Sequence, residues 1–178
     1  MDRRAAGFAL VEVLMAACLV ITVAVAVSQI SAAAVRASYA ARVRTLAAML
    51  AAQKMEQLRS LRWSRTRIGT PAVSVPVSDV STDLSSDPPT DAGPGLSPSP
   101  AGTLDSNVPF YVDYLDAGGT WVGHGATPPG AAVYVRRWAV QPLDSDSDDI
   151  LVLQGIVTTT ADAVAHQARF VSVLTRKP

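Results

Sequence analysis

The chain has 178 residues, 15 acidic and 15 basic side chains, and a hydrophobic content of 49% with only 6% aromatic residues. This length allows one modest domain and a membrane segment, and the single cysteine, Cys18, excludes an intrachain disulfide framework. The charges are unevenly distributed, because residues 36–67 hold eight basic residues and one acid, whereas residues 68–135 hold seven acids and no Lys or Arg. A neutral total therefore hides a basic segment followed by an acidic one.

An apolar run from Phe8 to Val27 follows a short leader, residues 1–7, that contains two arginines. The only clearly polar members of the run are Glu12 and Thr22. A helix of this length spans about 30 Å, which is the thickness of the bilayer core. The sequence therefore predicts a transmembrane helix over residues 8–29, with its basic leader in the cytoplasm.

Two ordinary targeting signals are alternative interpretations of this run. A secretory signal would be cut near Ala32–Ala34, but the run is longer than the usual length of roughly 7–15 residues and contains a carboxylate. A lipoprotein signal would use Met15–Cys18, but a lipid on Cys18 would make the apolar residues after it redundant. Either signal would indicate a monomeric membrane-anchored or secreted binding protein.

The third interpretation rests on Gly7, Phe8 and Glu12. The sequence Gly-Phe-Ala-Leu-Val-Glu at residues 7–12 resembles the class III leader of type IV pilins and type II secretion pseudopilins. The resemblance implies that a prepilin peptidase cuts between Gly7 and Phe8 and N-methylates Phe8, and that Glu12 serves assembly. It also implies a single-pass inner-membrane protein whose carboxyl-terminal head lies outside the cytoplasm and later enters a pilus or pseudopilus.

The carboxylate itself supports a function for Glu12. An acid in the middle of a membrane helix costs roughly 2.5–3.5 kcal/mol on insertion scales, so it is a functional candidate by default. The alternative is that Glu12 lies near the membrane boundary and reaches the headgroups.

The helix is expected to continue beyond the membrane segment. No Pro or Gly occurs between Phe8 and Gly69, which predicts one helix to about Arg62, with an amphipathic basic helix in residues 30–67. Its basic residues are spread around the helix without aromatic neighbours, so a solvated face is favoured and no nucleic-acid partner is expected. Apolar residues recur on one face at helical spacing and are expected to pack on the chain's own head: Val43, Leu46, Ala47, Leu50, Leu58 and Leu61.

Residues 51–59 resemble the end of the first helix in minor pilins of the PilV type and in minor pseudopilin I of type II secretion. Gln29 stands where the helix-kinking proline of major pilins is expected, and the carboxyl-terminal disulfide of many pilins is absent. The resemblance therefore implies a minor subunit. Its implied partners are prepilin peptidase, other pilins or pseudopilins, an inner-membrane assembly platform, and membrane lipid before assembly.

The carboxyl-terminal part is predicted to form a small sheet. Residues 68–107 are rich in Pro, Ser, Thr, Asp and Gly, and are expected to form a loop or linker because they bury too little apolar surface to offset their ordering entropy; a short strand at residues 73–77 is the exception. The head, residues 108–178, is predicted to be an antiparallel sheet of three or four strands that covers the apolar helix stripe, giving an α+β, pilin-like fold. The expected strands are residues 108–115, 132–140, 150–159 and 168–175.

No catalytic constellation is visible in the sequence. His124 and His166 are isolated, and no nucleophile–base pair or phosphate-binding glycine loop occurs. We therefore expect that the chain is not an enzyme and needs no cofactor. An acidic turn in residues 144–149 lacks the glycine and spaced glutamate of an EF-hand loop, so a solvated turn is favoured over a calcium site. Its candidate ligands are Asp144, Asp146 and Asp148.

Overall fold

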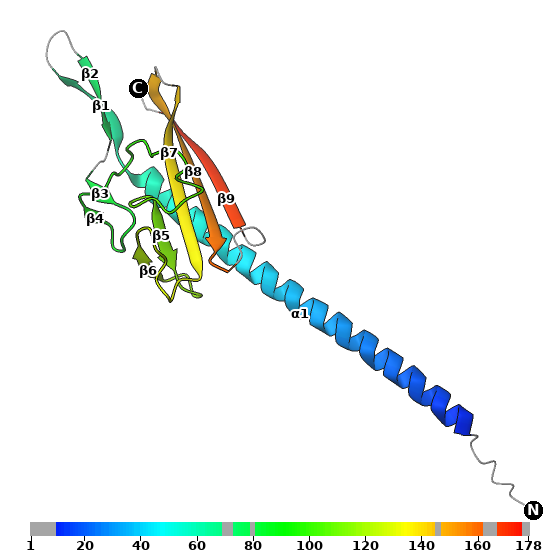
Figure 1. The fold of residues 1–178 in the computed structure, drawn as a ribbon. Coiled ribbons are helices and arrows are strands. Elements are labelled where there is room, and N and C mark those ends of the chain that lie inside the picture. Colours follow the sequence, from blue (N-terminus) through cyan, green and yellow to red (C-terminus); the bar gives the residue numbers. More distant parts are fainter. Residues whose placement is uncertain (1–9, 69–72, 79–80, 145–146, 162–166, 176–178) are drawn as a thin grey trace, which may run out of the picture. The chain divides into compact units, whose positions relative to one another are not determined.

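The computed structural model describes residues 10–68, 73–78, 81–144, 147–161 and 167–175. The fold is α+β, with one long helix and an antiparallel sheet as its main elements (Figure 1). The elements are α1 (Leu10–Ser60), β1 (Trp63–Ile68), β2 (Val73–Ser78), β3 (Thr82–Asp83), β4 (Thr90–Asp91), β5 (Val112–Leu115), β6 (Trp121–His124), β7 (Tyr134–Asp144), β8 (Ser147–Thr159) and β9 (Gln167–Thr175).

The chain divides into two compact units, Met1–Arg42 and Val43–Pro178. The described part of the first unit is the amino-terminal portion of α1, and its large apolar side chains are exposed from Leu10 (77%) to Val35 (69%). Without a Pro or Gly, nothing in this sequence breaks the helix. As the sequence predicts, α1 is long and apolar enough to cross a membrane.

The second unit contains a five-stranded antiparallel sheet in the order β6-β5-β7-β8-β9. The predicted strands in residues 132–140, 150–159 and 168–175 are confirmed within a few residues as β7, β8 and β9. β5 begins later than predicted, because Phe110 has a φ of 69° and cannot continue an extended strand. β6 was not predicted: it is short, contains Gly123 and pairs only with β5 at the edge of the sheet.

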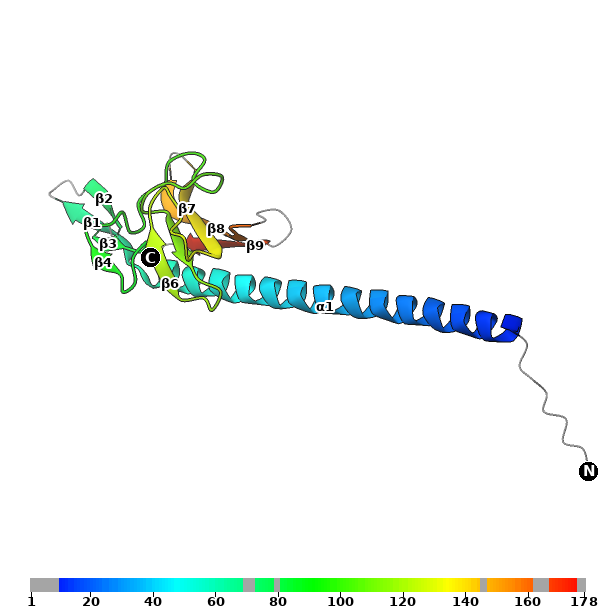
Figure 2. The same ribbon diagram turned by 60° about the horizontal axis from the view of Figure 1, so that its bottom comes forward.

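The last turns of α1 pack against this sheet, as Figures 1 and 2 show. Met55 and Leu58 lie in one core cluster with Trp138 of β7 and Leu153 of β8. The predicted apolar stripe is confirmed: four of its six residues are buried, and Leu46 and Leu61 are partly buried against the core. Each fully buried Leu or Val contributes roughly 1.5–3 kcal/mol. The buried residues of the helix are Val43, Ala47, Leu50, Ala51, Lys54, Met55 and Leu58.

Two expectations about the middle of the chain were wrong. First, α1 ends at Ser60, within two residues of the predicted end near Arg62, but the predicted amphipathic segment does not reach residue 67, because the β-prone residues from Trp63 to Ile68 form β1, which pairs antiparallel with β2. The predicted short strand is confirmed as β2. Second, the segment between β2 and β5 is not only a linker. Leu84 and Leu96 are 5% and 1% exposed and belong to the same core cluster as Trp138.

Candidate functional site

The residues predicted to be processed lie at the amino terminus. Gly7 and Phe8 lie outside the described residues. Glu12 lies in the first turn of α1, where the positive end of the helix dipole favours a carboxylate, and it is exposed. Val11 and Val13 beside it are also exposed, at 64% and 54%. Glu12 is therefore a polar group set in an accessible apolar helix surface.

The candidate calcium ligands lie in a turn whose side chains the structure does not describe. Asp144 is the last residue of β7 and Asp148 lies in β8, but the structure does not describe their side chains, and Asp146 lies outside the described residues. Within the described ranges, no group of three His, Cys, Asp or Glu residues is placed to hold a metal ion. His124 is exposed at the end of β6, and His166 is another residue that the structure does not describe.

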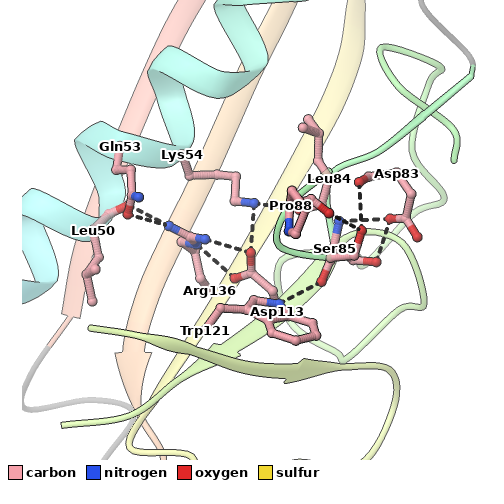
Figure 3. A network of polar contacts seen from close by, with 11 residues as sticks. Leu50, Gln53, Lys54, Asp83, Leu84, Ser85, Pro88, Asp113, Trp121 and Arg136 are labelled. Carbon is pink, nitrogen blue, oxygen red and sulfur yellow. Dashed lines mark hydrogen bonds and ion pairs between the residues drawn. The ribbon is translucent and has the colours of Figure 1, made fainter. Parts of the chain in front are cut away.

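The most unusual site in the described head is a buried charge cluster of Lys54, Asp113 and Arg136 (Figure 3). Lys54 Nζ lies 2.7 Å from Asp113 Oδ2, with both side chains 1% exposed. Arg136 binds the same carboxylate with two N–H groups, donating from Nε to Oδ1 at 2.8 Å and from Nη2 to Oδ2 at 2.7 Å. One carboxylate therefore holds two cations from two different elements, α1 and β7.

Further hydrogen bonds connect this buried charge cluster to the backbone around it. Lys54 donates to the carbonyl oxygen of Leu84 at 2.7 Å, and its ammonium lies 4.1 Å from the ring centroid of Trp138. Arg136 Nη1 donates to Leu50 O at 3.3 Å and to Gln53 Oε1 at 3.2 Å. The cluster thus ties α1 to β5, to β7 and to the segment after β3.

A second set of hydrogen bonds holds that segment in place. The Asp83 carboxylate accepts hydrogen bonds from the backbone N–H and the hydroxyl of Ser85, at 2.8 and 2.6 Å. Trp121 of β6 donates from its indole nitrogen to Ser85 O at 2.9 Å, as Figure 3 shows. Consecutive carbonyl groups, those of Leu84 and Ser85, are therefore bound by side chains from α1 and from β6.

Burial dominates the electrostatics of the cluster. The pKa of Lys54 is lowered from 10.5 to about 8: removal from water lowers it, the Asp113 carboxylate opposes this fall, and the neighbouring Arg136 adds to it. A charged group in the interior is tolerated only when partners replace its hydration. Here the partners of Lys54 are a carboxylate, a carbonyl oxygen and an aromatic face.

The geometry of the cluster suits a structural role, in which it holds α1 against the sheet, better than acid–base chemistry. Both carboxylate oxygens of Asp113 already accept hydrogen bonds from Arg136, so neither is free to take a proton from a substrate. A cavity of about 80 Å³ beside the cluster is bounded by Gln53, Gln57 and Trp121, among others. Gln57 Oε1 is buried there without a hydrogen-bond partner among the described residues.

This cluster was not predicted from the sequence, although the spacing of its residues carries a signal. Lys54 lies four residues after Leu50 and four before Leu58, which places it in the middle of the apolar helix stripe. Arg136 likewise stands between Tyr134 and Trp138, two inward-facing residues of β7 that are buried. A charged residue at a position whose neighbours on the same face are all apolar indicates a buried ion pair.

Comparisons of the chain with protein-family models, with curated proteins and with solved structures find no match. Its own residues and their arrangement therefore carry the functional proposal.

Proposed function

We propose that the chain is a minor pilin or pseudopilin. In this proposal prepilin peptidase removes residues 1–7, and the mature subunit assembles through α1 into a type IV pilus or a type II secretion pseudopilus. The subunit is structural and not enzymatic. The observation that carries the proposal is the position of the Gly-Phe-Ala-Leu-Val-Glu sequence, residues 7–12, at the start of a long helix with an exposed apolar surface.

This apolar surface needs a non-aqueous environment. The side chains from Leu10 to Val35 remain largely exposed in the isolated chain. Leaving a Val, Leu, Ile or Met side chain in water forfeits roughly 1.5–3 kcal/mol relative to burial. A bilayer covers the helix before assembly, and the helices of neighbouring subunits cover it afterwards. One sequence thus serves first as an anchor and then as an assembly surface.

Glu12 provides the register of assembly in this proposal. Cleavage after Gly7 creates an α-amino group on Phe8, which is largely cationic at neutral pH. In a bundle of apolar helices, the amine and the carboxylate each need a partner of opposite charge. Because neighbouring subunits are displaced along the fibre, the amine of an incoming subunit meets the Glu12 carboxylate of its neighbour. This pairing fixes the axial position and offsets the cost of burying both charges.

The head supports the same assignment at the level of architecture. The resemblance implies a pilin-like fold, in which the helix that continues from the anchor forms one wall of the core of an antiparallel sheet. In this chain Met55 and Leu58 of α1 pack with β7 and β8 in such a core. The exposed residues of the head are free to determine which partners the subunit joins.

The mature amino terminus tests the proposal. Intact-mass and amino-terminal sequencing of the protein, expressed with a prepilin peptidase, should give a chain that begins with methylated Phe8. Gly7→Leu should leave unprocessed, membrane-bound precursor, because the absence of a side chain lets the backbone approach the protease closely. The matched change Ala6→Leu should still be processed. A terminus near Val35, or a lipidated Cys18, would instead favour a monomeric membrane-anchored or secreted binding protein.

A further inference from the structure

The exposed surface of the first unit changes from apolar to basic after Val35. Val35 is the last exposed large aliphatic side chain of this unit, and Arg36 follows it directly. Tyr39 (67% exposed) and the exposed Arg42 come three and six residues after Arg36. At 100° per residue, these three side chains occupy one contiguous third of the helix surface over two turns. The expectation that the basic residues of the helix have no aromatic neighbours was therefore wrong here, because Tyr39 lies between the two arginines.

The two arginines have no counter-charge of their own. Among the described residues, neither Arg36 nor Arg42 forms an ion pair or a side-chain hydrogen bond. Between Glu12 and Glu56, α1 contains no acidic residue at all. The negative charge that balances these guanidinium groups must therefore come from outside the helix.

The spacing along α1 places this surface at the boundary of a bilayer. Arg36 is 24 residues after Glu12, which corresponds to a rise of about 36 Å in a helix. That rise exceeds the hydrocarbon core of about 30 Å but is less than the thickness of about 40–45 Å that includes the headgroups. With Glu12 near the cytoplasmic boundary, which is one of the two positions considered for it above, Arg36 reaches the opposite headgroup layer, and Tyr39 and Arg42 follow within the reach of their side chains.

We propose that Arg36, Tyr39 and Arg42 bind the phosphate groups of anionic phospholipids before the subunit is assembled. The guanidinium fork matches a phosphate in geometry and charge, and tyrosine prefers the membrane–water boundary because its ring is apolar and its hydroxyl is polar. The inference rests on the membrane anchor of the proposed function. The apolar surface that ends at Val35 favours a lipid over a nucleic acid, since it places the arginines next to hydrocarbon.

The test uses the full-length chain reconstituted in phosphatidylcholine vesicles that contain trace spin-labelled phosphatidylglycerol or phosphatidylcholine. Electron paramagnetic resonance measures the fraction of each label that the protein immobilises. We expect a preference for phosphatidylglycerol of about fivefold at low salt, which falls as salt screens the charges. The variant R36Q/R42Q should lower the preference towards unity. The matched control R59Q/R62Q removes two arginines from the second unit, at the end of α1 and just after it, and should keep the preference.

Two further results separate this inference from the proposed function. If an alkaline carbonate wash extracts the wild-type chain from the vesicles, the membrane anchor is wrong. If the chain resists extraction but immobilises both lipids equally, the anchor stands and the lipid-binding surface is wrong. The inference also fails if R59Q/R62Q loses the preference while R36Q/R42Q keeps it, or if Arg36 and Arg42 bind a short DNA duplex without any lipid preference.

Discussion

Lys54 Nζ and Asp113 Oδ2 lie 2.7 Å apart in the core of the head, although α1 and β5, which carry them, are separated by a long stretch of sequence. The same carboxylate also holds Arg136. The cluster is therefore asymmetric, because one anion serves two cations. Removal of the Asp113 carboxylate leaves both cations buried without an anionic partner, whereas removal of Lys54 leaves the ion pair between Arg136 and Asp113 intact.

This asymmetry predicts unequal effects of substitution. Asp113→Ala should lower the free energy of unfolding by about 3–5 kcal/mol, the usual cost of breaking a buried pair. Lys54→Met keeps most of the volume and the contact with Trp138, so its effect should stay within about 1.5 kcal/mol of zero. Urea unfolding of the detergent-solubilised chain, followed by tryptophan fluorescence, measures both values. Equal losses in the two variants would contradict a carboxylate-centred cluster.

The stability of the head should depend on pH through Lys54. Its pKa is about 8 in the folded chain and 10.5 when unfolded, so the unfolded chain holds more protons between these values. The free energy of unfolding should therefore rise with pH from 8 to 10, by up to about 1.4 kcal/mol per unit. Below pH 8 the penalty for the buried charge is fully present.

Urea unfolding at a series of pH values, with Lys54→Met as the control, checks this dependence. The rise should disappear in the variant. The range stops at pH 10 because burial raises the pKa of Tyr111 and of Tyr114, so that above this pH the two tyrosines lower the free energy of unfolding and oppose the rise from Lys54. A rise of the same size in Lys54→Met would assign the effect to another group.

The segment between β3 and β5 should be essential to the core. Leu96→Ala should cost about 2–5 kcal/mol, because Leu96 is 1% exposed in the main core cluster. The matched variant Leu143→Ala changes a leucine that is 61% exposed, and should cost less than about 1 kcal/mol. Deleting residues 80–100 should abolish cooperative unfolding, since it removes Leu84 with its hydrogen bond from Lys54 as well as Leu96.

Thermal unfolding with fluorescence detection distinguishes these variants. A deletion variant with a cooperative transition near that of the full chain would mean that the segment is a dispensable linker.

Glu12→Gln tests the assembly mechanism. The variant should still be inserted and cleaved, because the amide keeps the shape of the carboxylate and lowers the cost of insertion. It should fail to enter fibres when it is the only copy, because it cannot pair with the amine of a neighbour. Cross-linking between engineered cysteines on adjacent helices, in a Cys18→Ala background, reports assembly. Wild-type cross-linking in Glu12→Gln would refute the pairing and leave the anchor unaffected.

Periodicity predicted the regular parts of the fold. The absence of Pro and Gly predicted the long helix, its apolar stripe predicted the buried face, and segments rich in Val, Ile, Tyr and Phe predicted β7, β8 and β9. These features depend on neighbours along the chain, which the sequence displays directly. Whether the residues at the amino terminus are processed stays a prediction, since Gly7 and Phe8 lie outside the described residues.

The features that were missed depend on contacts distant in sequence. Leu84 and Leu96 stand alone among polar residues, and only the position of Trp138 and Met55 explains their burial. In the sequence, Lys54 looks no different from the solvent-exposed arginines of α1. Its burial is explained only by Asp113 and Arg136, which lie far from it along the chain. β6 is held by pairing with β5 and not by its own propensity, because Gly123 lies within it. The overall composition of a segment does not reveal such isolated residues.

The use of one helix as a wall of the core also sets an order of events during synthesis. The apolar face of α1 from Val43 to Leu58 is made early, but its covering strands β7 and β8 come from the last third of the chain. Until those strands emerge from the ribosome, this face has no native partner. The nascent chain must therefore expose this apolar face through much of its elongation, and such exposure favours aggregation.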